Sequence, residues 1–382
     1  MPGPVAIDRP PVVDAVELVP PAPGKNLPPR AFTSPEIFAL EQRAIFARSW
    51  IHVGDLGDLP AAGDYLTAMI GATPVIVLRD PRSGELRGFL NACRHRGAQL
   101  LEGRGSCGKQ IQCPYHAWSY GLDGHLIGVP YRDQFDCDLS QLGLVPVRVG
   151  SVGPLIFACV DPTAPSLDEW VGELAPAFAQ RGAERWQLAY ELTYELPVNW
   201  KLFVENANEG YHIPVVHDVL TDVLAPDTDV TTLEAHGAFT YVRVKPELVP
   251  PPFDPMQTKV RFGHLFPSFI PVLTLTDVTY LRIDPLAHDR MRLFVRCYDD
   301  PTYAHLRDFR RAAFERTTAQ DIEVVQKTWR GLHAVGLPAG VHASRLEARI
   351  GHFERRWATA MARELVDDRQ VARSPALAVA PA

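Results

Sequence analysis

The spacing of hydrophobic and polar positions changes twice along this chain. Between residues 31 and 50 apolar side chains recur at helical spacing, with Ser34 as an N-cap and Pro35 at the first helical position. From about residue 51 to residue 160 short runs alternate apolar and polar residues between Gly and Asp turns, which is typical of antiparallel strands. The pattern predicts an antiparallel β domain that follows a first helix.

A second pattern begins after the Pro-rich boundary at residues 161–165. It predicts an antiparallel sheet packed against long helices, so the expected fold class is α+β. The expected helices cover residues 167–180, 205–212 and 306–332, and the expected strands cover 187–196, 238–247 and 258–298. Residues 218–235 lack periodicity and are predicted to form a lid. The predicted organisation is a flexible Pro-rich arm (1–30), a β domain (46–160), a second domain (31–45 plus 161–370) and a loose tail (371–382).

Composition excludes several classes of protein. The chain has 382 residues, a formal net charge of −7 and no basic segment, so we expect no nucleic-acid partner. No apolar run approaches the ~20 residues of a membrane span, so no membrane insertion is expected. The first 30 residues hold nine prolines and lack the apolar core of a secretory signal. The six cysteines show no paired framework, and we expect a cytoplasmic protein with reduced thiols.

The first candidate site is formed by two Cys/His pairs. Cys93 and His95 are followed, 17 residues later, by Cys113 and His116. Two thiolates and two imidazoles suit a Rieske [2Fe–2S] cluster, with the cysteines on one iron and the histidines on the other. The same four residues could also hold a tetrahedral zinc ion. Glycines around the pairs predict tight loops, and the cluster is favoured because Cys-x-His pairs are unusual for zinc knuckles.

The second candidate site is a mononuclear iron centre. His212 and His217 flank Pro214, which breaks a helix and lets the two imidazoles converge. Two histidines and one carboxylate form the facial triad that leaves positions on Fe(II) open. Asp321 is the candidate carboxylate, and Glu323 is its competitor.

The residues around both sites carry a family resemblance. Asn91–Gly97 and Cys113–Trp118 resemble the two cluster loops of Rieske non-haem iron oxygenases, and residues 199–217 resemble their catalytic-domain motif. The resemblance covers about residues 32–360. It implies a helix-grip catalytic domain, and it supports Asp321 as the third ligand because Asp321 precedes the Gly331-Leu332 pair at the family's spacing. It also implies that Glu209 bridges the cluster of one subunit to the mononuclear iron of the next, with Asn206 as a neighbouring donor.

The resemblance implies a function and its partners. A separate NAD(P)H-dependent reductase, directly or through a ferredoxin, would supply electrons, so that the chain itself uses NAD(P)H only indirectly. The chain would be a terminal oxygenase that hydroxylates or dihydroxylates an aromatic or other apolar small molecule with O2, as a homotrimer or a trimer of alpha-beta pairs. An alternative is monooxygenation or demethylation of an amine or quaternary ammonium compound. A Rieske electron carrier without oxygenase activity is an alternative of another class.

The expected substrate pocket is an apolar stretch on the second sheet. Its candidate residues are Phe262, His264, Phe266, Phe269 and Leu273. Together these side chains suggest an apolar or aromatic substrate. A cationic substrate would need an aromatic cage or a carboxylate, and this stretch offers aromatic rings but no acid. His264 is the one polar group among these residues.

Overall fold

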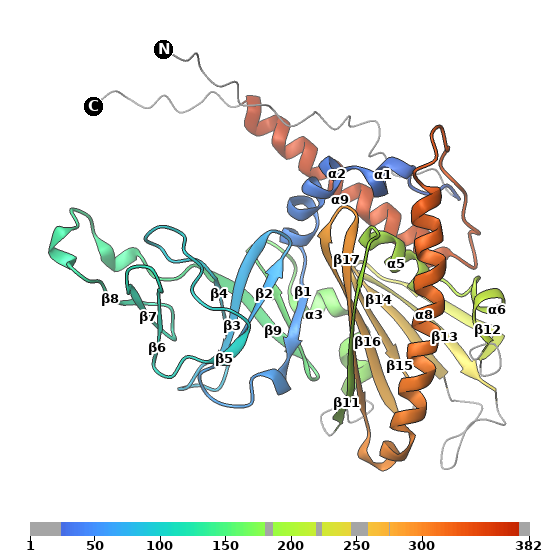
Figure 1. Cartoon of the computed structure of the whole chain (residues 1–382), viewed down its shortest axis with the longest axis horizontal. Coiled ribbons are helices and arrows are strands. Elements are labelled where there is room, and N and C mark those ends of the chain that lie inside the picture. Colours follow the sequence, from blue (N-terminus) through green and yellow to red (C-terminus); the bar gives the residue numbers. More distant parts are fainter. Residues whose placement is uncertain (1–23, 180–185, 219–223, 246–258, 275, 374–382) are drawn as a thin grey trace.

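The computed structural model describes residues 24–179, 186–218, 224–245, 259–274 and 276–373. In this part of the chain the elements form a β domain and a larger domain of sheet and helices, which lie beside each other (Figure 1). The predicted α+β class and its two antiparallel sheets are confirmed. No helix in these ranges has the length and apolar character needed to cross a bilayer.

The β domain is built on a seven-stranded antiparallel sheet in the order β1-β10-β9-β4-β3-β2-β5. A small three-stranded sheet, β6-β7-β8, extends from it and carries the second Cys/His loop. The strands are β1 (Ile51–Asp55), β2 (Asp64–Ile70), β3 (Thr73–Arg79), β4 (Leu86–Leu90), β5 (Arg104–Ser106), β6 (Gln110–Gln112), β7 (Ser119–Gly121), β8 (Leu126–Gly128), β9 (Pro146–Val152) and β10 (Leu155–Cys159).

The larger domain has a second seven-stranded antiparallel sheet, ordered β11-β17-β16-β15-β14-β13-β12. Its strands are β11 (Gln187–Leu196), β12 (Leu224–Leu233), β13 (Gly237–Val244), β14 (Lys259–Leu265), β15 (Phe269–Leu273), β16 (Asp277–Ala287) and β17 (Arg290–Asp299). The helices are α1 (Pro29–Thr33), α2 (Pro35–Ala44), α3 (Leu167–Val171), α4 (Leu174–Ala179), α5 (Trp200–Ala207), α6 (Ile213–Val216), α8 (Arg307–Gly331) and α9 (Ala348–Arg373). Helix α5 packs on β16 and β17, and α8 packs on α5 and β11.

The two faces of the second sheet have different neighbours. Side chains alternate between faces along a strand, so Phe269 and Tyr280 project toward the β domain, where both rings contact His52. Tyr280 also donates a hydrogen bond to Asp55 of β1 over 2.7 Å. Residues of both domains therefore share one hydrophobic core, which fixes the β domain against the back of the sheet.

A buried carboxylate ties the first helices to the rest of the larger domain. Glu41 of α2 is fully buried and accepts hydrogen bonds from Lys201 Nζ at 2.5 Å and from the indoles of Trp200 and Trp357 at 2.7 Å each. A buried ion pair of this kind costs desolvation energy that these hydrogen bonds offset. The contact explains why a helix that precedes the β domain packs with α5 and α9 beyond it.

Three expectations about irregular segments are changed by the structure. The predicted lid at 218–235 contains the edge strand β12, and residues 219–223 lie outside the described ranges. The predicted arm contributes ordered residues at its end, because Leu27 is buried and its N–H donates to Glu354 at 2.8 Å; residues 1–23 lie outside the described ranges. Helix α9 continues to Arg373, and the rest of the predicted tail, 374–382, is also outside them.

Candidate active site

The two histidines of the predicted mononuclear site lie at the ends of a single helical turn. The predicted helix over 205–212 ends earlier, at Ala207, and Asn208 is its C-cap. Helix α6 then runs from Ile213 to Val216, with His212 as its N-cap and His217 as its C-cap. Pro214 stands near the start of α6, where proline is tolerated, and does not interrupt a longer helix. This short turn brings the Nε2 atoms of His212 and His217 to 3.0 Å.

Asp321 of α8 completes this group. Its Oδ1 lies 3.1 Å from Nε2 of His217 and 3.4 Å from Nε2 of His212. Among the described residues, His212, His217 and Asp321 are the one set of at least three potential metal ligands whose ligand atoms all lie within 4.8 Å of one another. The competitor Glu323 points to solvent, with 67% of its side chain exposed, and pairs with Lys327. The geometry therefore favours Asp321 as the third ligand.

The outer nitrogens of both imidazoles are held by neighbouring side chains. Glu209 contacts Nδ1 of His212 through Oε1 and accepts the His212 backbone N–H through Oε2 at 3.0 Å. Gln320 Oε1 lies 3.0 Å from Nδ1 of His217. An imidazole that donates through Nδ1 presents the lone pair of Nε2, so these contacts aim both Nε2 atoms at the shared space.

The electrostatics of the group suit a cation. Burial alone would lower the pKa of His212, but its hydrogen bonds to Asp321 and Glu209 raise that pKa to about 9. Burial would raise the pKa of Asp321, yet the two histidines hold it below the usual value. Asp321 Oδ1 is buried and has no well-directed hydrogen-bond partner among the described residues. An orphaned carboxylate oxygen between two imidazole nitrogens is the donor set that a non-haem Fe(II) site uses, so the residues fit a mononuclear iron.

The two Cys/His loops have the same backbone design. In the first, Cys93 N–H donates to Ala98 at 2.8 Å and Gly97 N–H donates to Cys93 at 2.9 Å. In the second, Cys113 N–H donates to Trp118 at 2.8 Å and Ala117 N–H donates to Cys113 at 3.1 Å. Gly97 and Ala117 occupy the equivalent position and have φ of 73° and 57°. Glycine adopts this left-handed conformation freely, so only the second loop carries strain there.

The loops place their side chains around a common space. Cys93 and Cys113 are buried, and the rings of His95 and His116 lie 4.7 Å apart. The rings of Trp118 and His95 stack with centroids 5.1 Å apart, and Nδ1 of His95 is buried without a hydrogen-bond partner in the part of the chain that the structure describes. These four residues do not form a group of three ligand atoms within 4.8 Å in the described chain, a spread too wide for one zinc ion. The donors fit a two-iron cluster with divided Cys and His ligands.

Two contacts at these sites were not predicted from the sequence. Tyr120 O–H lies 3.2 Å from Cys93 Sγ and accepts the Arg94 N–H at 3.0 Å, so it can donate to a ligand thiolate. Burial and the contact with Cys93 raise the pKa of Tyr120, which keeps the hydroxyl protonated. Gln320, adjacent to Asp321, is the other contact. Gln320 could have been considered because it is adjacent to the candidate ligand Asp321. Tyr120 could have been considered because side chains alternate along a strand, so that it points to the same side as Trp118.

The predicted donor Asn206 and the nearby Asn208 differ in burial. Asn206 is half-buried on α5, and the structure records no contact between it and Glu209. Asn208, two residues later, is 1% exposed, and neither its Oδ1 nor its Nδ2 has a hydrogen-bond partner in the described chain.

The predicted pocket residues separate onto different faces of the second sheet. Phe262 and Ile213 of α6 both pack against the small buried cluster of Val242 and Val260. His264 is buried against Phe353 of α9 and lies 3.1 Å from the Pro267 carbonyl, and burial lowers its pKa to about 3. Phe266 also contacts Phe353.

Phe269 and Leu273 are not brought to the histidine turn. They lie two pleats apart on β15, on the face toward the β domain, and Phe269 contacts Phe157 there. Of the predicted pocket residues, Phe262 is therefore the one that shares a hydrophobic cluster with a residue of α6.

The two candidate sites lie far apart within one chain. The cluster loops follow β4 and join β6 to β7, at one end of the molecule in Figure 1, whereas α6 lies at the opposite end. His116 is exposed at its end of the molecule.

Comparison with known proteins agrees with both halves of the chain. Residues 49–147 match the family described as Rieske [2Fe-2S] domain, and residues 183–363 match the ring hydroxylating alpha subunit catalytic domain. The chain belongs to the Rieske oxygenase family. The predicted family is confirmed, and the two matched domains imply a [2Fe–2S] cluster and a mononuclear iron.

Members of this Rieske oxygenase family with different substrates resemble the chain. The glycine betaine monooxygenase oxygenase subunit of Chromohalobacter salexigens is 37% identical over 215 residues, which are 56% of this chain and 48% of that protein. The carnitine monooxygenase oxygenase subunit of Escherichia coli is 34% identical over 226 residues, which are 58% of this chain and 60% of that protein. The biphenyl 2,3-dioxygenase subunit alpha of Rhodococcus jostii is 36% identical over 207 residues, 52% and 44% respectively. The chain thus matches about half the length of these curated relatives.

Solved structures of Rieske oxygenases share the fold over most of the chain. The quaternary ammonium Rieske monooxygenase CntA in complex with L-carnitine is 25% identical, with a TM-score of 0.75 over 90% of this chain and 98% of its own. Naphthalene 1,2-dioxygenase from Rhodococcus sp. is 23% identical, with a TM-score of 0.70 over 91% and 95%, and shows the fold alone.

Proposed function

We propose that this chain is the terminal oxygenase component of a cytoplasmic electron-transfer system. An NAD(P)H-dependent reductase delivers the electrons, directly or through a ferredoxin. The observation that carries the proposal is the convergence of His212, His217 and Asp321 within 4.8 Å in a chain that also places two Cys/His loops around a second site. An electron carrier needs the loops but has no use for the second group of ligands.

Each set of residues has a defined part in this proposal. Cys93, Cys113, His95 and His116 would hold the [2Fe–2S] cluster, and the two histidines and Asp321 would hold Fe(II). With both groups bound, the site supplies the electrons and the open iron coordination positions that O2 reduction requires. The protein's own contribution is orientation: Glu209 and Gln320 fix the imidazoles, and Tyr120 is placed to donate to a Cys93 thiolate.

We propose that electrons pass between subunits. The cluster loops and α6 lie at opposite ends of one chain, the ring of His116 is exposed, and Glu209 already contacts His212 (Figure 1). A neighbouring chain in a cyclic trimer could place its His116 near Glu209, which would then link the cluster of one subunit to the iron of the next.

Mixed oligomers test this arrangement. Chains with Cys93→Ser lack a cluster and chains with Asp321→Ala lack the mononuclear iron, so each variant alone should be inactive. Co-expressed variants should regain part of the activity if electrons cross between subunits, because one interface then joins an intact cluster to an intact iron. Two differently tagged copies of the Asp321→Ala chain are the control, and they should stay inactive. No recovery in mixed oligomers of proven composition contradicts the proposal.

We propose an amine or quaternary ammonium compound as the substrate, which places the alternative from the sequence analysis ahead of the aromatic one. The support is that relatives named as glycine betaine and carnitine monooxygenases, and the monooxygenase structure with L-carnitine, resemble this chain. The aromatic ring stays a second candidate because biphenyl 2,3-dioxygenase is 36% identical over part of the chain. Phe262 provides an aromatic face beside α6 that either substrate can use.

Two measurements test the function. Protein purified without oxygen should contain about three iron atoms and two acid-labile sulfides per chain, whereas an electron carrier would contain about two of each. Oxygen uptake with a surrogate reductase should then be stimulated by trimethylammonium carboxylates more than by biphenyl or naphthalene. The reverse order of stimulation would favour the aromatic substrate. An iron content of only about two atoms per chain after Fe(II) reconstitution would contradict the oxygenase function.

A further inference from the structure

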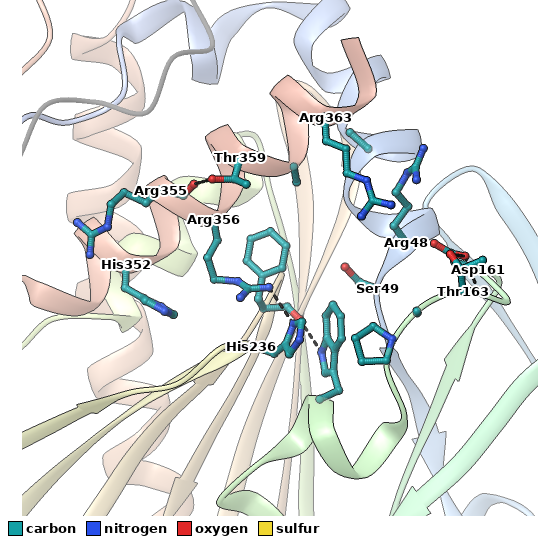
Figure 2. Close-up of a pocket in the computed structure, with 16 residues that line it drawn as sticks. Arg48, Ser49, Asp161, Thr163, His236, His352, Arg355, Arg356, Thr359 and Arg363 are labelled. Carbon is teal, nitrogen blue, oxygen red and sulfur yellow. Dashed lines mark hydrogen bonds between the residues drawn. The ribbon is translucent and has the colours of Figure 1, made fainter. Parts of the chain in front are cut away.

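A cavity of about 520 Å³ lies away from both iron sites, where α9 faces the segment that follows β10. His236, just before β13, and Phe266, just after β14, are among the residues that line it, and Figure 2 shows His236 beside Arg356. No predicted ligand of either metal site lines it. The volume falls within the range of about 300–1,000 Å³ that small-molecule sites occupy.

The lining of this cavity has an excess of positive charge. Four arginines, Arg48, Arg355, Arg356 and Arg363, line it together with one acidic residue, Asp161. Arg48 is paired with Glu364 at 2.7 Å. In the described part of the chain, no carboxylate forms an ion pair with Arg356 or Arg363. Figure 2 shows these two side chains directed into the cavity and Arg355 directed away from it.

Arg356 is held in place but is not satisfied. Its guanidinium lies 4.8 Å over the ring of Phe266, and Nη2 donates to Nδ1 of His236 at 2.9 Å. Its Nε is buried without a hydrogen-bond partner among the described residues, as is Nδ1 of His352. Burial lowers the pKa of Arg356 to about 10, and burial together with Arg356 lowers the pKa values of His236 and His352 to about 4. The positive charge at neutral pH therefore resides on the arginines, and the buried, unpaired N–H of Arg356 Nε calls for an acceptor.

One wall of the cavity is aromatic. The indole of Trp170 stacks on His236, with centroids 4.1 Å apart and planes at 21°. Trp170 Nε1 donates to the Phe266 carbonyl at 3.1 Å, which fixes the orientation of the ring. Guanidinium groups recognise planar carboxylates and phosphates through paired hydrogen bonds, and a flat aromatic wall accepts the organic part of such a molecule.

We propose that this cavity is a binding site for a small organic anion, whose carboxylate or phosphate group is held by Arg356 and Arg363. The site is independent of the substrate position at the mononuclear iron. The cavity lies mainly in the larger domain. Ser49 and Asp161 line it where this domain borders the β domain.

Calorimetric titration of the iron-loaded full chain, in a buffer of low chloride, tests the site. Inorganic phosphate and citrate are the two probes; binding of the first alone identifies a phosphate site, and binding of the second alone a carboxylate site. Arg363→Gln should weaken the binding about 10-fold or more, because it removes a charge-assisted hydrogen bond. Arg311→Gln makes the same change of charge on α8, where the side chain is 52% exposed, and should leave binding unchanged.

Other results overturn the proposal. Absence of saturable binding of either probe contradicts it, and so does an equal loss in Arg311→Gln, which indicates a general charge effect. Arg356→Gln should abolish binding while the absorbance of the cluster is retained, which shows that the protein is folded. If Arg363→Gln leaves anion binding intact and raises only the KM for the reductase, the arginines serve a protein partner and not a small anion.

Discussion

Replacement of Glu209 by glutamine is the most informative single change at the mononuclear site. Glu209 is the residue that touches both the ring and the backbone of His212, and only 9% of its side chain is exposed. Glutamine keeps the size and one carbonyl acceptor but removes the charge. A hydrogen bond to a charged group contributes about 1.5–3 kcal/mol and a neutral one about 0.5–1.5 kcal/mol, so the expected loss is about 1.5 kcal/mol. This corresponds to roughly 10-fold weaker Fe(II) binding, at the lower end of the effects seen for groups that orient metal ligands.

The assay separates orientation of the ligand from electron transfer. Fe(II) affinity is measured by titration of apoprotein that retains its cluster, and product formation is measured again at saturating Fe(II). If Glu209 only orients His212, saturating Fe(II) restores turnover; if it also links subunits, turnover stays low while the reduced-cluster EPR signal is unchanged. Glu323→Gln removes one charge from an exposed position on α8 and should behave as wild type. Wild-type iron affinity and wild-type turnover in Glu209→Gln would refute the reasoning.

Three further changes test other contacts. Asp321→Ala should leave the cluster intact but lower iron by about one atom per chain, because a facial triad needs its carboxylate; full iron content with full turnover would exclude Asp321 as a ligand. Tyr120→Phe removes a hydrogen bond to the Cys93 sulfur that contributes about 1 kcal/mol, and it should lower the reduction potential of the cluster by about 40 mV for a one-electron couple. A redox titration followed by EPR measures this potential. An unchanged or raised potential would speak against the hydrogen bond. Glu41→Gln leaves Lys201 as an uncompensated buried charge, so thermal unfolding should show a loss of about 3–5 kcal/mol; an unchanged Tm would show that Lys201 is not charged there.

The candidate ligands of both sites could be named from the sequence because most of them are close together in the chain. Cys93 with His95, Cys113 with His116, and His212 with His217 are each close in the chain, and a short loop or turn is enough to bring each pair together. The same is true of the strand and helix periods, which predicted β11 and α8 nearly to their ends. The helix over 205–212 failed because an apolar period does not show where a helix stops, and the break after Ala207 is stabilised by contacts between Glu209 and His212.

Tertiary structure alone decided what depends on strand register and on the docking of distant helices. The sequence by itself determined the family and the α+β class, and it named the candidate ligands of both sites, since these follow from short motifs and periodic patterns. It could not separate Phe262 from Phe269, because a strand directs alternate residues to opposite faces and only the pairing of β14 with β15 shows which face meets α6. Nor could it show that Gln320 reaches His217, or that α9 carries Arg356 and Arg363 over Trp170 and His236, because packing of long-range neighbours places those side chains.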